Sequence, residues 1–232
     1  MNRGKHLLPA FGVLAVVQMT VVSTLDGLSR PGYDETRNWI SQLSLGANGW
    51  HGTANLATCG LWVILCAIGM YRRADGQAVG LILWCGLCLV SLAVVRTDAG
   101  LGFPPGAPEE HTLRGLIHKL ISLTLAVAGI GAVARVGARR TAWVVAAVMT
   151  VSFVAAGVLV LLDDGGVLPG NPSGLLERVA LFAGLGWIGL VSGRVAADSS
   201  VVRRGAASPT GVAGRVRTPA AAKAPAEAGR GR

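Results

Sequence analysis

The residues best able to do chemistry lie along one apolar segment, where four polar side chains recur at helical spacing. These are His111, Arg114, His118 and Ser122, with Lys119 beside them. At a rise of about 1.5 Å per residue, His118 lies roughly 10 Å along the helix from His111, so the two imidazoles cannot readily share one metal ion. An ionisable residue at membrane depth is costly and usually faces the bundle interior or a wet cavity. We therefore expect His118 to face other polar groups.

Candidate partners for this imidazole come from other segments of the chain. The candidate ligand-binding residues are Ser41, Asn55, Asp98, His118, Glu177 and Arg178, and the candidate catalytic residues among them are His118, Asp98 and Glu177. A pocket that collects them could bind a polar head group, hold a metal ion or carry out acid–base chemistry. Alternatively, these groups only satisfy one another across helices.

The sequence assigns neither a metal site nor a cofactor. Zinc needs three or four ligands within about 2.0–2.3 Å of the ion, and the short His-x-x-x-His spacing is absent. A metal held by His118, Asp98 and one acid from a later loop stays an open alternative. The Cys-x-x-Cys spacing of Cys85 and Cys88 falls within an apolar run, where cysteine packs as a small apolar residue.

Six apolar runs must position the polar residues. They cover residues 7–25, 53–71, 78–95, 117–134, 142–162 and 179–195, and each is near the 17 to 25 residues or so that cross a bilayer core. The chain is 52% apolar and 14% charged, whereas soluble domains carry about a quarter charged residues. This composition excludes a typical soluble enzyme. It predicts an all-α fold, a polytopic six-helix transmembrane bundle that forms one domain over residues 1–195.

The basic residues give the expected orientation in the cell membrane. With the N-terminus inside, 15 of the 21 Lys and Arg residues lie on the cytoplasmic side, so both termini are predicted to be cytoplasmic. Residues 196–232 contain few large apolar side chains and are predicted to be a disordered basic tail. Anionic lipid head groups suit such a tail. Nucleic acid is not expected as a partner, because the tail has no aromatic residue on which bases could stack.

The three predicted outer loops are longer than the two inner ones, so a binding site is expected to open outward. The first outer loop contains Pro31-Gly32 followed by Asp34, and Gly46 ends its apolar pattern. This pattern predicts a short amphipathic helix that caps the pocket or only anchors the first two spans. In the second outer loop, Pro108-Glu109 is typical of a helix start, because proline fits the first turn and carboxylates favour its positive end.

These polar residues sit in short motifs that resemble the bacterial membrane-protein family called domain of unknown function 998. The motifs are Pro31-Gly32-Tyr33, Ile40-Ser41-Gln42-Leu43, Asn55, Asp98, Gly115-Leu116-Ile117-His118, and Gly174-Leu175-Leu176-Glu177-Arg178 with Trp187. The resemblance runs from about Leu7 to Val195 and implies a compact six-span helical protein, without an established activity. Arg96-Thr97 stands before Asp98 where the family tends to carry Phe-Pro, which places an extra cation beside that carboxylate.

Two functions are consistent with these residues. The first is a non-catalytic membrane protein that binds a lipid or small amphiphile in an outward-facing polar pocket. The second is a membrane-embedded enzyme that acts on lipid, as a hydrolase or an acid–base cyclase and possibly with a metal. Transport is weakly supported, because the six runs show no obvious internal repeat or broken helix pair. The sequence does not indicate an oligomeric state.

Overall fold

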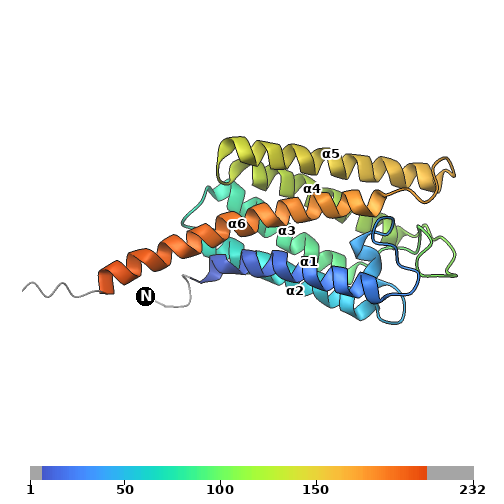
Figure 1. The fold of residues 1–232 in the computed structure, drawn as a ribbon, viewed down its shortest axis with the longest axis horizontal. Helices are drawn as coiled ribbons and strands as arrows, with labels where there is room; N and C mark the ends of the chain where they lie inside the picture. The colour runs from blue at the N-terminus through green and yellow to red at the C-terminus, as the bar shows by residue number, and fades with distance from the viewer. Residues whose placement is uncertain (1–6, 208–232) are drawn as a thin grey trace, which may run out of the picture.

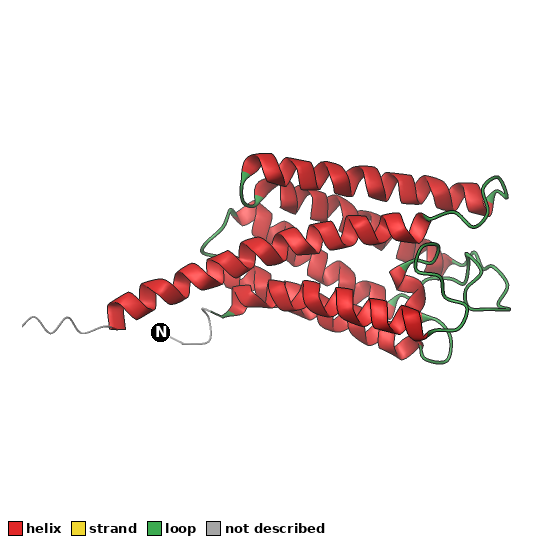
Figure 2. Ribbon diagram, viewed as in Figure 1, coloured by secondary structure: helices red, strands yellow, loops and turns green. Residues whose placement is uncertain are grey.

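The computed structural model describes residues 7–207, with side chains described up to residue 198. This part of the chain is helical throughout its long elements and contains no strand (Figures 1 and 2). The six long helices are α1 (Phe11–Ser29), α2 (Gly49–Met70), α3 (Gly76–Val94), α4 (Leu113–Arg135), α5 (Arg139–Asp164) and α6 (Ser173–Ala207). A 3₁₀ turn, η2 (Leu8–Ala10), precedes α1, and a second 3₁₀ helix, η3 (Ile40–Ser44), lies between α1 and α2. The predicted all-α fold is confirmed.

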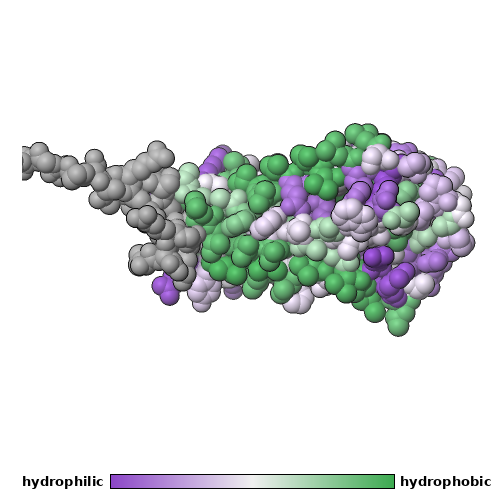
Figure 3. All heavy atoms as spheres, turned by 90° about the horizontal axis from the view of Figure 1, so that it is seen from below, coloured by the Kyte–Doolittle hydropathy of each residue, from purple (hydrophilic) through white to green (hydrophobic). Residues whose placement is uncertain are grey.

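Each of the six helices is long and apolar enough to cross a membrane. The surface of the bundle carries many exposed Leu and Val side chains, as expected where lipid replaces water. On the face shown in Figure 3, apolar residues extend along the bundle, and most hydrophilic residues gather toward one end. The chain is therefore an integral membrane protein with several spans.

The helices form a closed ring in which each packs against the next and α6 packs against α1 (Figure 1). Residues 71–75 and 136–138 make the two short connections, which turn the chain directly from one helix into an antiparallel neighbour. The three longer connections, residues 30–48, 95–112 and 165–172, gather at the opposite end, which we call the loop end. The start of α1 and the end of α6 lie at the other end of the bundle.

Glycines bring some of these helices into backbone contact. A Cβ atom at Gly60 of α2 would lie 2.7 Å from the carbonyl oxygen of Gly86 on α3, and the reverse distance would be 2.8 Å. A Cβ at Gly189 of α6 would likewise lie 3.1 Å from the carbonyl oxygen of Gly12 on α1. Small residues permit this close approach in membranes, where packing rather than water exclusion drives helix association.

The four cysteines lie within this packed interior. Cys59, Cys66, Cys85 and Cys88 are all buried, and none forms a disulfide. Cys59 and Cys66 lie among the buried side chains that α2 contributes to the core. The interpretation of the cysteines as small packing residues is confirmed.

The helices extend beyond the apolar runs of the sequence, because polar side chains decide where the helices begin. The sixth helix starts at Ser173 rather than at residue 179, and the side chain of Asn171 accepts a hydrogen bond from the Ser173 amide just ahead of it. The same helix continues to Ala207, so residues 196–207 of the predicted disordered tail are helical. The rest of that tail, 208–232, lies outside the described residues.

The loops also differ from the predicted pattern. The fourth helix begins at Leu113 instead of near Pro108, because the Thr112 hydroxyl accepts the Gly115 amide and caps the helix. In the first outer loop, the carboxylate of Asp34 accepts hydrogen bonds from both the amide and the hydroxyl of Thr36, so it closes a turn instead of starting a helix. The helical part is the shorter η3.

Close packing of α2 on α3 predicts the effect of a single substitution. Gly60→Val should lower the melting temperature in detergent, because its Cβ would meet the backbone of α3 and overpacking costs about 1–3 kcal/mol. Gly80→Val is the matched control, since a Cβ at Gly80 meets nothing within 4 Å. Equal melting temperatures for the two variants would contradict this packing.

Candidate functional site

A buried arginine holds the first loop of the loop end, residues 30–48, against the start of α6. Nη1 of Arg178 donates to the carbonyl oxygens of Asn38 and Gly174 at 2.7 and 3.1 Å, and Nη2 donates to the Tyr33 hydroxyl at 2.5 Å. Burial raises the pKa of Tyr33 well above its usual range, although the guanidinium opposes this shift. The phenol therefore stays a neutral partner, and Arg178 contacts the loop rather than an open space.

A second arginine fixes the end of the same loop. Arg30 donates two hydrogen bonds of 3.0 Å to Asp26, and it donates further bonds to the carbonyl oxygens of Leu43, Leu45 and Asn48. Sequence reasoning missed this cluster, although an acid and an arginine four residues apart near a helix end are a recognisable signal. Together the two arginines determine where η3 lies.

Asp98 caps the start of α4. Its two carboxylate oxygens accept the amide and the hydroxyl of Thr112 at 2.7 and 2.6 Å. Burial raises the pKa of Asp98, but the bonds from Thr112 and the charges of Arg114 and Lys119 outweigh it, and the pKa is lowered overall. A Cβ at Gly115 would collide with the carboxylate, so glycine is required for this close contact.

His118 projects from α4 into the interior of the protein. It is 3% exposed, and its Nδ1 lies 2.6 Å from the carbonyl oxygen of Val95 at the end of α3. Because a carbonyl only accepts, Nδ1 must carry a proton, and in the neutral imidazole Nε2 is then an acceptor. Nε2 is buried and has no hydrogen-bond partner among residues 7–207. The imidazole thus offers one unused acceptor.

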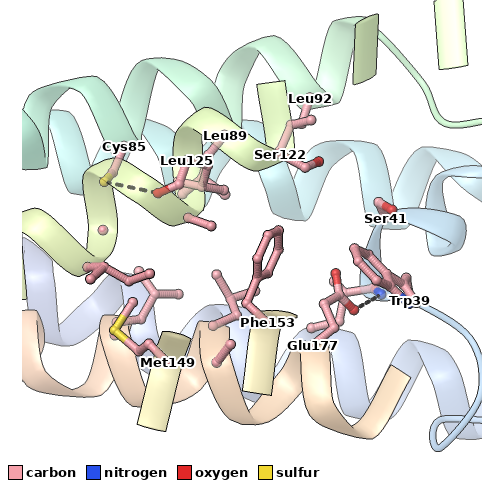
Figure 4. A pocket seen from close by; sticks show the side chains of 18 of the residues that line it. Trp39, Ser41, Cys85, Leu89, Leu92, Ser122, Leu125, Met149, Phe153 and Glu177 are labelled. Carbon is pink, nitrogen blue, oxygen red and sulfur yellow. Dashed lines mark hydrogen bonds between the residues drawn. The ribbon is translucent and has the colours of Figure 1, made fainter. Parts of the chain in front are cut away.

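Glu177 uses only one of its carboxyl oxygens. Oε2 accepts the Ile40 amide at 2.7 Å, which ties α6 to η3. Within the described part of the chain, no donor contacts the other oxygen, and Glu177 lines a cavity at the centre of the helix ring. Figure 4 shows this carboxyl group beside Trp39 with its second oxygen toward the cavity.

The central cavity is apolar along most of its length (Figure 4). Side chains of α2 to α6 and of η3 surround a space of about 90 Å³. Its deeper walls include Leu89, Leu125, Met149 and Leu185. Ser41, Ser122 and Glu177 supply polar groups nearer the loop end. The cavity therefore joins an apolar interior to a polar mouth.

A second space, which we call the outer crevice, lies between the loop-end halves of α4 and α5. It measures about 460 Å³, and His118, Lys119 and Gly157 are among its lining residues. The crevice and the central cavity share a junction lined by Trp39, Ser41, Ser122 and Phe153.

The junction contains an unused hydrogen-bond donor. The rings of Trp39 and Phe153 meet there edge to face, 6.2 Å apart. Nε1 of Trp39 is buried and has no partner in the described residues.

A family model for proteins of unknown function, DUF998, matches residues 13–194. The chain belongs to the DUF998 family. No curated protein and no solved structure matches it. The family resemblance drawn from the short motifs is confirmed, whereas the activity has to be inferred from the site itself.

The structure brings together four of the six candidate residues of this DUF998 protein. Ser41, Asp98, His118 and Glu177 line the connected cavity and crevice. Arg178 lies behind them and holds the loop. Asn55 is elsewhere, between α1 and α2, where its side chain accepts a hydrogen bond from Gln18 at 3.1 Å.

Sequence reasoning did not connect Trp39 or Phe153 with the site, because aromatic residues do not stand out from their apolar neighbours as polar residues do, and Phe153 lies in an almost entirely apolar run. Among the described residues, no group of three or more His, Cys, Asp and Glu side chains is arranged to hold a metal ion.

The capping role of Asp98 predicts a pH-dependent stability. Because its pKa is lowered on folding, the charged form stabilises the fold above the ordinary value of 3.8, and this contribution disappears as the pH falls through the lowered value. Asp98→Asn should therefore reduce stability near neutral pH by about 1–2 kcal/mol. The difference in stability between Asp98→Asn and wild type should become smaller at acidic pH. Thermal unfolding in detergent measures it, and the exposed Asp164→Asn is the control. If the difference in stability between wild type and Asp98→Asn stays constant with pH, the charge of the Asp98 carboxylate has no part in it.

Proposed function

We propose that this protein binds a membrane-soluble amphiphile, with its apolar chain in the central cavity and its polar head at the junction. The observation that supports this most is the order of the lining residues: Leu and Met side chains deep in the bundle, then Ser41, Ser122 and Glu177 at the mouth. Ligand sites are commonly apolar clefts with a few placed polar groups. An amphiphile has the same division between apolar and polar parts.

The unused polar atoms support the same proposal. A buried donor or acceptor without a partner costs about 1–3 kcal/mol. Trp39 lines the junction and His118 lines the outer crevice, and each residue has such an atom. A head group placed there would supply hydrogen bonds that the described residues do not.

The outer crevice suits entry from the bilayer. It lies between α4 and α5 and reaches the junction through Phe153. A Cβ at Gly157 would meet nothing within 4 Å, so this part of α5 leaves open space beside the crevice. A lipid could then move sideways into the cavity without leaving the membrane.

Binding is favoured over catalysis by the contacts of the three candidate catalytic residues. Asp98 uses both oxygens to hold Thr112, and Glu177 uses one oxygen to hold Ile40. Within the described part of the chain, no hydrogen bond joins either carboxyl group to His118. These contacts support positioning roles for the acids.

We also infer that the loop end faces the outside of the cell membrane and both termini face the cytoplasm. The excess of Lys and Arg residues near the opposite end supports this orientation. The head group would then lie in the outer half of the bilayer.

Filling the cavity should abolish binding. Ala126 lines the central cavity, so Ala126→Phe should weaken the 1:1 binding of a twelve-carbon amphiphile at least tenfold, measured by native mass spectrometry in detergent. The probes are dodecan-1-ol, dodecylamine and dodecyl phosphate. Ala147→Phe on the exposed face of α5 is the matched control and should bind like wild type. Saturable binding that Ala126→Phe leaves unchanged would place the ligand outside this cavity.

A substitution in the crevice separates the route from the binding site. Gly157→Phe should slow the approach to equilibrium binding severalfold and change the final occupancy less than Ala126→Phe does, because Gly157 borders the crevice and not the central cavity. Gly80→Phe on the exposed face of α3 serves as its control. Unchanged binding kinetics in Gly157→Phe would rule out entry between α4 and α5.

The orientation can be tested with reporter fusions after Arg73, Pro105 and Arg140. Alkaline phosphatase, which is active outside the cytoplasm, should be active only when fused at Pro105, because this residue lies in a loop-end connection. A cytoplasmic fluorescent reporter should show the reverse pattern. Phosphatase activity in the fusions at Arg73 and Arg140 would show that the protein has the opposite orientation.

A further inference from the structure

The polar atoms around the junction show which head group would fit, if the central cavity binds an amphiphile as proposed above. Nε2 of His118 is an acceptor and points to a donor on the ligand, whereas the free oxygen of Glu177 accepts when the carboxyl group is ionised and donates when it carries a proton. One donor, Nε1–H of Trp39, requires an acceptor on the ligand. The hydroxyls of Ser41 and Ser122 can do either.

Positive charge is scarce where the head group would lie. Among the described residues that line the central cavity, Glu177 is the only Asp or Glu, and there is no Lys, Arg or His. The neighbouring Arg178 directs its guanidinium to Tyr33, Asn38 and Gly174 instead. A phosphate carries about 1.5 to 2 negative charges at neutral pH, and no Lys or Arg side chain lines the cavity to balance them.

The outer crevice, like the central cavity, is lined by more acidic than basic side chains. Its lining acids are Asp98, Glu109, Glu110 and Asp164, and its lining bases are Lys119, His111 and His118. Lys119 already lies near Asp98 and lowers the pKa of that carboxyl group. An anionic head group would therefore meet more negative than positive groups on its way to the cavity.

We propose that the ligand is a lipid with an uncharged hydroxyl head, such as a long-chain alcohol or an acylglycerol. A hydroxyl group donates one hydrogen bond and accepts others, so it can donate to Glu177 or His118 while it accepts from Trp39. An ammonium head has donors only and leaves the Trp39 N–H without a partner. A phosphate head places acceptors against the acceptor Nε2 of His118.

Three probes of equal chain length test the head group directly. Wild-type protein in detergent is titrated with dodecan-1-ol, dodecylamine and dodecyl phosphate, and 1:1 complexes are counted by native mass spectrometry. The alcohol should bind at least tenfold more tightly than either charged probe. The ranking uses wild-type protein alone, so it holds even where a variant fails to fold.

Trp39→Phe then tests the donor. It keeps an aromatic ring but removes the N–H, so the alcohol should lose about fivefold in affinity while the amine is unchanged. Trp143→Phe is the matched control, because Trp143 is 57% exposed on α5 and lies outside both spaces. A uniform loss for all three probes in Trp39→Phe would show a packing effect and contradict the donor role.

The outcomes separate this inference from the proposed function on which it rests. If no probe binds more tightly to wild type than to Ala126→Phe, the proposed cavity site itself is wrong. If the amine or the phosphate binds most tightly and Ala126→Phe still abolishes binding, the cavity site stands and the hydroxyl head group is wrong.

Discussion

The buried guanidinium of Arg178 is the constraint on which the loop end depends. A charged group inside a membrane protein must have its donors satisfied, because leaving them unpaired costs several kcal/mol. Arg178 meets this requirement with Asn38, Gly174 and Tyr33, and so it binds the first loop of the loop end to α6. Once the loop is fixed there, Ile40 reaches Glu177, and η3 covers the central cavity.

The cavity follows from uneven packing around the helix ring. Gly60 and Gly86 let α2 and α3 approach until their backbones touch, and Gly12 and Gly189 do the same for α1 and α6. Where larger side chains from α3 to α6 meet across the ring, they do not fill its centre. Met149 extends toward α6 because Gly184 leaves room for its methyl group, and it lines the cavity there. The same bundle is thus tight at its glycine contacts and open beside α4 and α5.

The sequence predicted the six spans well because hydropathy depends on local composition, which each apolar run carries in full. It predicted helix starts poorly, since these depend on contacts between distant residues: Asp98 holds Thr112 in place, and Thr112 then sets the start of α4. It identified Ser41, His118 and Glu177 because polar residues stand out in apolar runs. It could not distinguish them from Arg178, whose polar groups are satisfied by the loop.

A hydroxyl head group would also explain why the junction keeps polar atoms that weaken the empty protein. Each unpaired buried atom lowers the free energy of unfolding, and apolar residues of similar shape at these positions would be nearly neutral or stabilising. A ligand that binds only the folded state raises the free energy of unfolding, and the increase grows with the ligand's occupancy. The unpaired atoms of Trp39 and His118 would therefore lower the free energy of unfolding without the proposed ligand and raise it when the ligand is bound. These two destabilising residues line the junction and the crevice, where an amphiphile would place its polar end.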